Sequence, residues 1–137
     1  MGQIQDVFAK AAKAELWAGN LITGRSDSGN KLENRTPIDN SLIGYIADGE
    51  AADIDAAVAV ARSTFNSGEW SDLSPAERKA VMQRWAKLME DNIEELAALD
   101  CIDAGKPISE CLNTDLPATI ETFHWYAEAA DKVFGKV

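Results

Sequence analysis

Apolar residues recur every three or four positions along the C-terminal part of the chain, which predicts a long amphipathic helix beginning at Leu116. A second stripe on a neighbouring face of the same helix carries Asp115, Ala118, Thr122, Tyr126, Ala129 and Val133. The first stripe consists of Leu116, Ile120, Phe123, Ala127, Ala130 and Phe134, and Gly135 is expected to end the helix. Since a surface helix of a small domain needs only one apolar stripe, this helix is expected to pack inside a larger body.

Helical spacing also marks three stretches upstream. Residues 4–17 predict an amphipathic docking helix, and their mixed charges do not favour a membrane-surface role. The segment from Asp53 to Phe65 is rich in alanine, and its apolar face is predicted to be Ile54, Val58, Ala61 and Phe65.

The third stretch begins at Ser74-Pro75-Ala76-Glu77, which is a capping box with proline at the first helical position. Asp91 or Asn92 is then expected to cap another helix, which ends after Ala104 at Gly105 with Pro107 following. The expected buried face of that helix is Ile93, Leu96, Ala97, Asp100 and Ala104.

Between these helical regions, Leu21 to Gly49 contains β-branched and aromatic residues separated by Gly, Ser, Asn and Pro. This pattern predicts two or three short strands joined by turns. Because a short isolated strand pair is marginally stable, it is a second indication that the chain is part of something larger.

Composition narrows the function classes. The 137 residues carry 23 acidic and 13 basic side chains, a net charge of −10, which argues against a nucleic-acid partner. The absence of a signal peptide or a continuous apolar span predicts a soluble protein in the reducing cytoplasm. Cys101 and Cys111 lack metal-binding spacing and are expected to be reduced, packed thiols, and His124 is expected to be solvated or locally bonded.

Several unusual strings occur in a fixed order: ADG before an alanine-rich helix, then GEWSDLSPAER, DAGKP and WYAEAADKV. With these strings the chain resembles the N-terminal part of NAD(P)-dependent aldehyde dehydrogenases over roughly Leu21 to Val137. The most similar members are of the gamma-glutamyl-gamma-aminobutyraldehyde dehydrogenase type, which oxidise amino-aldehydes.

The resemblance implies an α/β aldehyde dehydrogenase-like fold, of which this chain is an N-terminal fragment, mostly α-helical with a short N-terminal β-strand pair. It divides the chain into an amphipathic helix (1–19), short strands of the oligomerisation or bridging sheet (20–49) and the helical N-terminal part of the cofactor-binding domain (50–137). It also implies a homo-oligomer that acts on a small-molecule aldehyde.

In the family, a cysteine in a GQxC string attacks the aldehyde, hydride passes to NAD or NADP, and a glutamate in an LELGGK-like string helps water hydrolyse the thioester. None of these strings, nor the cofactor segment, occurs in this sequence. The isolated chain is therefore expected to be inactive and to bind no cofactor. Cys101 and Cys111 match ordinary helix and loop positions of the family, so neither is assigned as the nucleophile.

Two minor sites are implied by the resemblance. Thr114, Asp115, Ala118 and Thr122 match positions that line the aldehyde entry tunnel. The small Ala118 would leave room for an extended substrate, and Asp115 could face a cationic amino group, or could instead be an N-cap before Leu116-Pro117. Asn34, Asp103 and the backbone of Arg35 match a monovalent-cation site near the DAGKP turn.

A function from another class is also open. The chain could be a non-catalytic, α-rich interaction module that docks onto a full-length relative through its apolar helix faces and unpaired strands. As the front of an enzyme, the isolated chain is expected to be sticky or molten. As a module, it is expected to unfold cooperatively and to form a defined complex.

Overall fold

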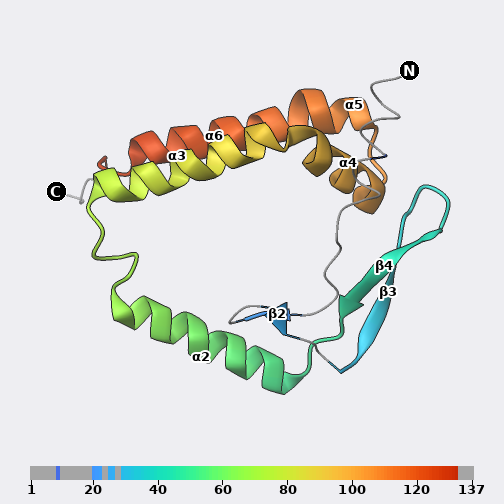
Figure 1. Ribbon diagram of the computed structural model, residues 1–137, viewed down its shortest axis with the longest axis horizontal. Helices are drawn as coiled ribbons and strands as arrows, with labels where there is room; N and C mark the ends of the chain where they lie inside the picture. The colour runs from blue at the N-terminus through green and yellow to red at the C-terminus, as the bar shows by residue number, and fades with distance from the viewer. Residues whose placement is uncertain (1–8, 10–19, 23–24, 27–28, 133–137) are drawn as a thin grey trace.

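The computed structural model describes residues 9, 20–22, 25–26 and 29–132 (Figure 1). The predicted helix over residues 4–17 and the positions Val133, Phe134 and Gly135 lie outside these residues, apart from residue 9. The described elements are β1 (Asn20–Leu21), β2 (Arg25–Ser26), β3 (Lys31–Arg35), β4 (Leu42–Ala47), α2 (Ala51–Ser67), α3 (Pro75–Asp91), α4 (Ile93–Ala104), α5 (Ile108–Glu110), the π-helical turn η1 (Cys111–Asp115) and α6 (Leu116–Ala129). The predicted mostly helical fold with short strands is confirmed.

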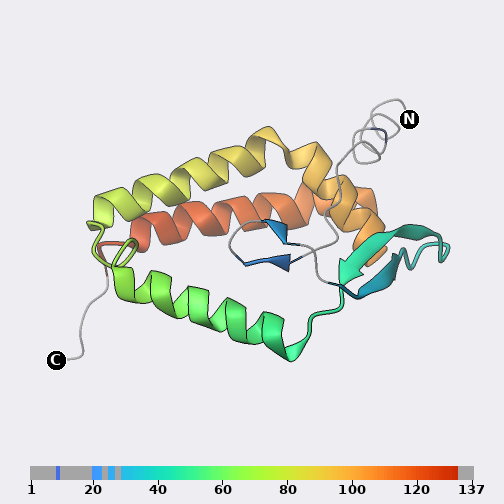
Figure 2. The ribbon, with the colours of Figure 1, turned by 60° about the horizontal axis from the view of Figure 1, so that its bottom comes forward.

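Helices α3 and α6 lie side by side, and α4, α5 and η1 gather at one end of this pair (Figures 1 and 2). The predicted capping box starts α3: the Ser74 hydroxyl accepts from the Glu77 amide, and the Glu77 carboxylate accepts from the Ser74 amide at 2.8 Å. Between the helices, the rings of Trp85 and Phe123 meet edge to face with centroids 4.7 Å apart.

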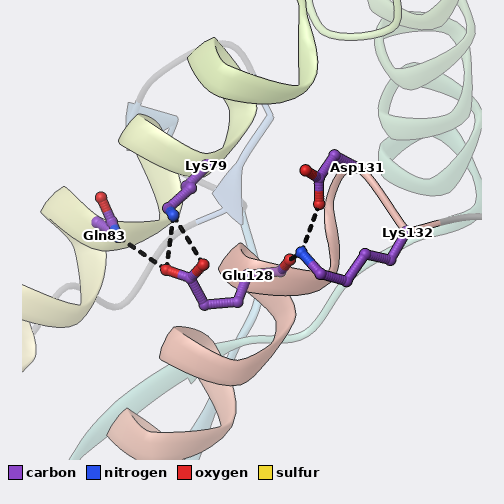
Figure 3. A network of polar contacts seen from close by, with 5 residues as sticks. All are labelled: Lys79, Gln83, Glu128, Asp131 and Lys132. Carbon is purple, nitrogen blue, oxygen red and sulfur yellow. Dashed lines mark hydrogen bonds and ion pairs between the residues drawn. The ribbon is translucent and has the colours of Figure 1, made fainter.

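A polar network also joins α3 to α6 at the end of α6 (Figure 3). The Lys79 ammonium lies 2.7 Å from the Glu128 carboxylate, which also accepts from the Gln83 amide. Lys132 donates to the Glu128 carbonyl and pairs with Asp131. Because these groups are largely exposed, the network is expected to contribute little to the stability of the fold.

The buried apolar core of the described residues consists of small side chains and one isoleucine: Ala86, Ala97, Ala98, Cys101, Cys111, Ile120 and Ala127. The expected face of α4 was partly wrong, because Ala98 and Cys101 are buried there while Ala104 is exposed. The reason is that α4 packs on two sides. Ala98 packs with Leu99, Ile102 and Ile108. Ala97 and Cys101 pack with Cys111 and with Ile108, Leu112 and Leu116.

The junction between α3 and α4 is close to the prediction. Asn92 occupies the N-cap position of α4, but its side chain makes no capping hydrogen bond there. It donates instead to the Leu88 carbonyl at 2.7 Å, and so satisfies the C-terminus of α3. At the other end of α4, Gly105 has the left-handed conformation expected after a helix, with φ of 70°.

Helix α6 begins at Leu116, as predicted, but it ends at Ala129 rather than near Gly135, and it continues a helical path instead of restarting one. The backbone is already helical in α5 and passes through η1, where the Leu116 amide donates to the Cys111 carbonyl five residues back. Pro117 has no amide hydrogen, and its ring would crowd the carbonyl of a regular preceding turn. The wider π-helical turn lets the chain continue into α6 without a break.

The strand region forms two antiparallel pairs, β1 with β2 and β3 with β4, rather than two or three strands. The register of the second pair sets Lys31 opposite Ala47, and it shifts between Asn34 and Arg35. Asn40 has φ of 64° in the connecting turn, a left-handed conformation that asparagine tolerates.

Helix α2 contributes nothing to the core. Its ends are well specified, by reciprocal hydrogen bonds between Glu50 and Asp53 and by Gly68 with φ of 77°. Yet none of its residues is buried, and Ile54, Val58 and Phe65 are 61%, 62% and 69% exposed. Both views show α2 apart from the α3–α6 pair (Figures 1 and 2).

The two stripes predicted on α6 have different surroundings. Ile120 and Ala127 of the first stripe are buried, and Phe123 is half-buried. Ala118, Thr122 and Tyr126 of the second stripe are exposed. The middle of the second stripe is therefore uncovered among the described residues, while Asp115 and Ala129 at its ends are half-buried. None of the described helices is both long and apolar enough to cross a membrane.

This contrast predicts different responses to the loss of an apolar side chain. Ile120→Ala should lower the free energy of unfolding by about 2–4 kcal/mol, since it leaves a cavity between packed helices. Val58→Ala, the control on exposed α2, should change it by less than about 0.5 kcal/mol. Urea unfolding followed by circular dichroism measures both, and equal losses would contradict the described core.

Candidate functional site

The predicted tunnel residues lie where η1 passes into α6. Asp115 ends the π-helical turn, and Ala118 and Thr122 follow on the same face of α6, one and two turns later. Ala118 and Thr122 line a shallow surface groove together with Glu121, Trp125 and Tyr126. Neither Thr114, which is exposed, nor Asp115, which is half-buried, lines this groove.

The groove combines apolar surface with the exposed Glu121 carboxylate. The Thr122 hydroxyl donates to the Ala118 carbonyl at 2.8 Å, so it is engaged within the helix. Trp125 and Tyr126 pack edge to face with centroids 4.8 Å apart, and both rings are more than half exposed. Such a surface can hold an organic chain by apolar contact.

Asp115 is engaged by a residue that sequence analysis did not single out. Its carboxylate forms a hydrogen-bonded ion pair with the Lys106 ammonium, which comes from the DAGKP turn. The side chains remain 34% and 45% exposed, respectively. Asp115 precedes α6, but its backbone is helical and its side chain makes no capping hydrogen bond. The alternative interpretation of Asp115 as a capping side chain is therefore wrong.

The charge on Lys106 is favoured by its surroundings. The hydrogen bond to Asp115 raises the pKa of Lys106, and the negative charges of Asp115 and Asp100 add to this effect. Lys106 is therefore an ammonium at neutral pH. Its nine-residue separation from Asp115 spans a turn and α5, so helical periodicity gave no signal for the pair.

Next to this pair, Asp100, Cys111 and Asp115 bring one side-chain ligand atom each within 4.8 Å of one another. Metal binding by a cysteine requires the thiolate. Burial, followed by the hydrogen bond with Asp100, raises the pKa of Cys111 to about 11, so the thiol is protonated at neutral pH. Since Lys106 already supplies the positive charge, this donor set does not fit a metal ion.

The residues predicted for a monovalent cation are partly brought together. The Asn34 side-chain amide donates to the Asp103 carboxylate at 2.7 Å and so joins β3 to the end of α4. The Arg35 guanidinium turns away to Glu33 at 2.8 Å and also donates to the Asn40 carbonyl. Nearby, a Cβ on Gly105 would lie 2.7 Å from Pro37, so this turn packs closely on the hairpin. An amide N–H, rather than an oxygen, faces Asp103.

Comparison with known proteins now decides the family. A profile described as the aldehyde dehydrogenase family matches residues 24–137. The chain belongs to the aldehyde dehydrogenase family. It is 47% identical over 106 residues to the NADP/NAD-dependent aldehyde dehydrogenase PuuC of Escherichia coli, and 43% identical over 106 residues to the aminoacetaldehyde dehydrogenase of Pseudomonas aeruginosa.

Each of these two alignments covers 77% of this chain but only 21% of the relative, so the chain spans about a fifth of the length of these curated relatives. Among solved structures, the gamma-glutamyl-gamma-aminobutyraldehyde dehydrogenase of Burkholderia cenocepacia superposes with a TM-score of 0.90 at 40% identity. That superposition covers 98% of this chain and 28% of the other. The predicted family and its fold class are confirmed.

In this aldehyde dehydrogenase chain, Cys101 and Cys111 are free and buried, as predicted. Burial raises the pKa of Cys101, and the charge of Asp100 adds to it. His124 is exposed, with Nε2 3.2 Å from the Glu90 carboxylate, which confirms local bonding. The surroundings of these three side chains are therefore those of packing and surface residues. None of the three has the features of an activated nucleophile or base.

Thiol reactivity tests this assignment. Alkylation of native Cys111 by iodoacetamide should be slow at pH 8 and should rise toward pH 11, because only the thiolate reacts. Asp100→Asn should shift this pH profile downward and increase the rate at pH 8 by about threefold to tenfold, since it removes a negative charge.

Glu110→Gln, a change in the exposed residue beside Cys111, is the matched control and should leave the profile in place. Labelling sites are read by peptide mass spectrometry. Alkylation of native Cys111 at pH 8 as fast as in urea would contradict both its burial and its raised pKa.

Proposed function

We propose that this chain forms the N-terminal part of an NAD(P)-dependent aldehyde dehydrogenase that oxidises amino-aldehydes to carboxylic acids. The observation that carries the proposal is the similarity to a gamma-glutamyl-gamma-aminobutyraldehyde dehydrogenase over 98% of this chain at 40% identity. The names of two further relatives, NADP/NAD-dependent PuuC and aminoacetaldehyde dehydrogenase, support the same cofactor class and substrate class.

In this proposal the catalytic cysteine, the glutamate and the cofactor segment belong to the remainder of the enzyme. NAD or NADP accepts hydride there, and the isolated 137-residue chain is inactive and binds no cofactor. The helices from residue 50 onward belong to the cofactor-binding domain, residues 20–49 to a bridging sheet of a homo-oligomer, and residues 1–19 to a docking helix. The assembled enzyme acts in the cytoplasm.

In this proposal one wall of the aldehyde tunnel runs from Thr114 and Asp115 at the end of η1 to Ala118 and Thr122 on α6. Two features support this wall. Ala118 is small and does not obstruct the groove, and the exposed Trp125 and Tyr126 rings present apolar surface along the helix. The monovalent cation at Asn34, Arg35 and Asp103 stays a prediction.

A second candidate is a non-catalytic interaction module that docks onto a full-length relative. The exposed apolar face of α2 favours a surface that packs against another chain or segment. Both candidates need a partner for this face. They differ in whether the chain, once joined to a catalytic part, completes an enzyme.

A chimera separates the candidates. The full chain replaces the matching N-terminal segment of Escherichia coli PuuC, and NADH formation from aminoacetaldehyde is followed by absorbance. We expect the chimera to turn over the aldehyde and the isolated chain to show no activity. A soluble chimera that binds NAD but lacks turnover would contradict the enzyme proposal and favour the module.

The tunnel wall is tested by Ala118→Leu in the same chimera. The larger side chain should lower kcat/KM for phenylacetaldehyde by about tenfold, because it narrows the path, and should affect propanal little. Ala52→Leu on exposed α2 is the control. An equal loss for both aldehydes, or none for either, would exclude Ala118 from the tunnel.

A further inference from the structure

We infer that Lys106 is a specificity-determining residue, which pairs with Asp115 and thereby limits the attraction of the tunnel wall for cationic aldehydes. The inference rests on the proposed function, since it takes the face of α6 at Asp115 as part of the substrate path. It extends that function by assigning a role to a residue of the DAGKP turn that lies outside the predicted tunnel positions.

The position of Lys106 is set by the turn that carries it. Gly105, with φ of 70°, ends α4, and Pro107 opens α5, so Lys106 stands between two backbone constraints. From this turn its ammonium reaches the Asp115 carboxylate at the end of η1. The pair thus joins the turn to the start of α6 and orients the Asp115 side chain.

The Asp115 carboxylate remains available to solvent. Its side chain is 34% exposed, and the next residues on the same face, Ala118 and Thr122, are exposed and small. Thr122 and Thr119 donate their hydroxyls to helix carbonyls, so neither of them covers the carboxylate by bonding to it. A substrate that moves along this face would meet Asp115 together with the ammonium that neutralises it.

The local charge balance depends on Lys106. Asp100 and Asp115 act on this ammonium, and the protonated Cys111 thiol beside them is neutral. Replacing Lys106 with a neutral residue would leave two neighbouring carboxylates without their ammonium. The field at the start of α6 would become more negative, and it would act on a cationic aldehyde but not on a neutral one.

A purely structural role for the pair predicts something different. If Lys106 only holds the turn against α6, its loss changes the reaction of every aldehyde to the same degree. The ratio of kcat/KM for aminoacetaldehyde to kcat/KM for propanal distinguishes the two roles, because these substrates are similar in size and differ in charge.

The experiment uses the chimera that carries the full chain. Lys106→Met should raise the ratio about twofold to fivefold, because one charge at a partly exposed site contributes up to about 1 kcal/mol. Lys106→Gln removes the same charge while keeping a hydrogen-bond donor for Asp115. If the Lys106→Met variant does not fold, the ratio is measured in Lys106→Gln instead. Lys106→Arg should keep the ratio within about twofold, because the positive charge remains.

Two further variants complete the set. Lys106→Met combined with Asp115→Asn should return the ratio toward that of the unmutated chimera, since the released carboxylate is gone. Lys79→Met breaks another ion pair between elements, with Glu128, and is the matched control that should not move the ratio (Figure 3).

An unchanged ratio in Lys106→Met or Lys106→Gln, with both substrates affected equally, would overturn the inference and leave the proposed function intact. A lowered ratio would also overturn it. An unmutated chimera without turnover would contradict the proposed function, and with it the inference, so the two failures are distinguishable.

Discussion

The close packing of small side chains where α4 meets α5 and η1 is the constraint on which the described fold depends. Ala97, Ala98, Cys101 and Cys111 are nearly or fully buried there, so α4 and the segment after its turn approach one another closely. A larger side chain at such a position would force the helices apart, because protein interiors have few voids. The same packing brings Cys111 and Asp115 beside the end of α4, and so it positions the start of the candidate tunnel wall.

The fold is otherwise sparse in buried apolar surface. Helix α2 has well-formed ends but no buried residue, and the outer face of α6 exposes Trp125 and Tyr126. Local capping interactions specify where such helices begin and end, whereas tertiary packing supplies most of their stability. The chain belongs to the aldehyde dehydrogenase family and spans about a fifth of the length of its curated relatives; in the proposed function the remainder of the enzyme covers these faces.

Sequence patterns predicted the features that local interactions decide. The Ser74 capping box, the left-handed Gly105 and the buried stripe through Ile120 all follow from short-range chemistry, and the structure contains them. The π-helical turn before Pro117 was missed, because helical spacing alone does not show how a chain accommodates a proline within a continuing helix.

Tertiary contacts explain the other differences. The Lys106–Asp115 pair and the hydrogen bond from Asn34 to Asp103 join separate elements, the second across 69 positions of sequence. Of these, only Asn34, Asp103 and Asp115 were suggested by the family resemblance, and no spacing rule indicated Lys106. The buried face of α4 was only partly predicted for a similar reason: Ala97 is buried as expected, but Ala98 and Cys101 are buried as well, because two clusters of side chains pack against the helix.

The central claim is that this chain is one part of an aldehyde dehydrogenase whose remainder covers α2. Amide hydrogen exchange of α2, measured in the isolated chain and in the chimera with PuuC, tests it most directly. We predict fast exchange along α2 in the isolated chain and at least about tenfold slower exchange in the chimera, with α4 and α6 protected in both. Strong protection of α2 in the isolated chain, or equally fast exchange in both proteins, would contradict the claim.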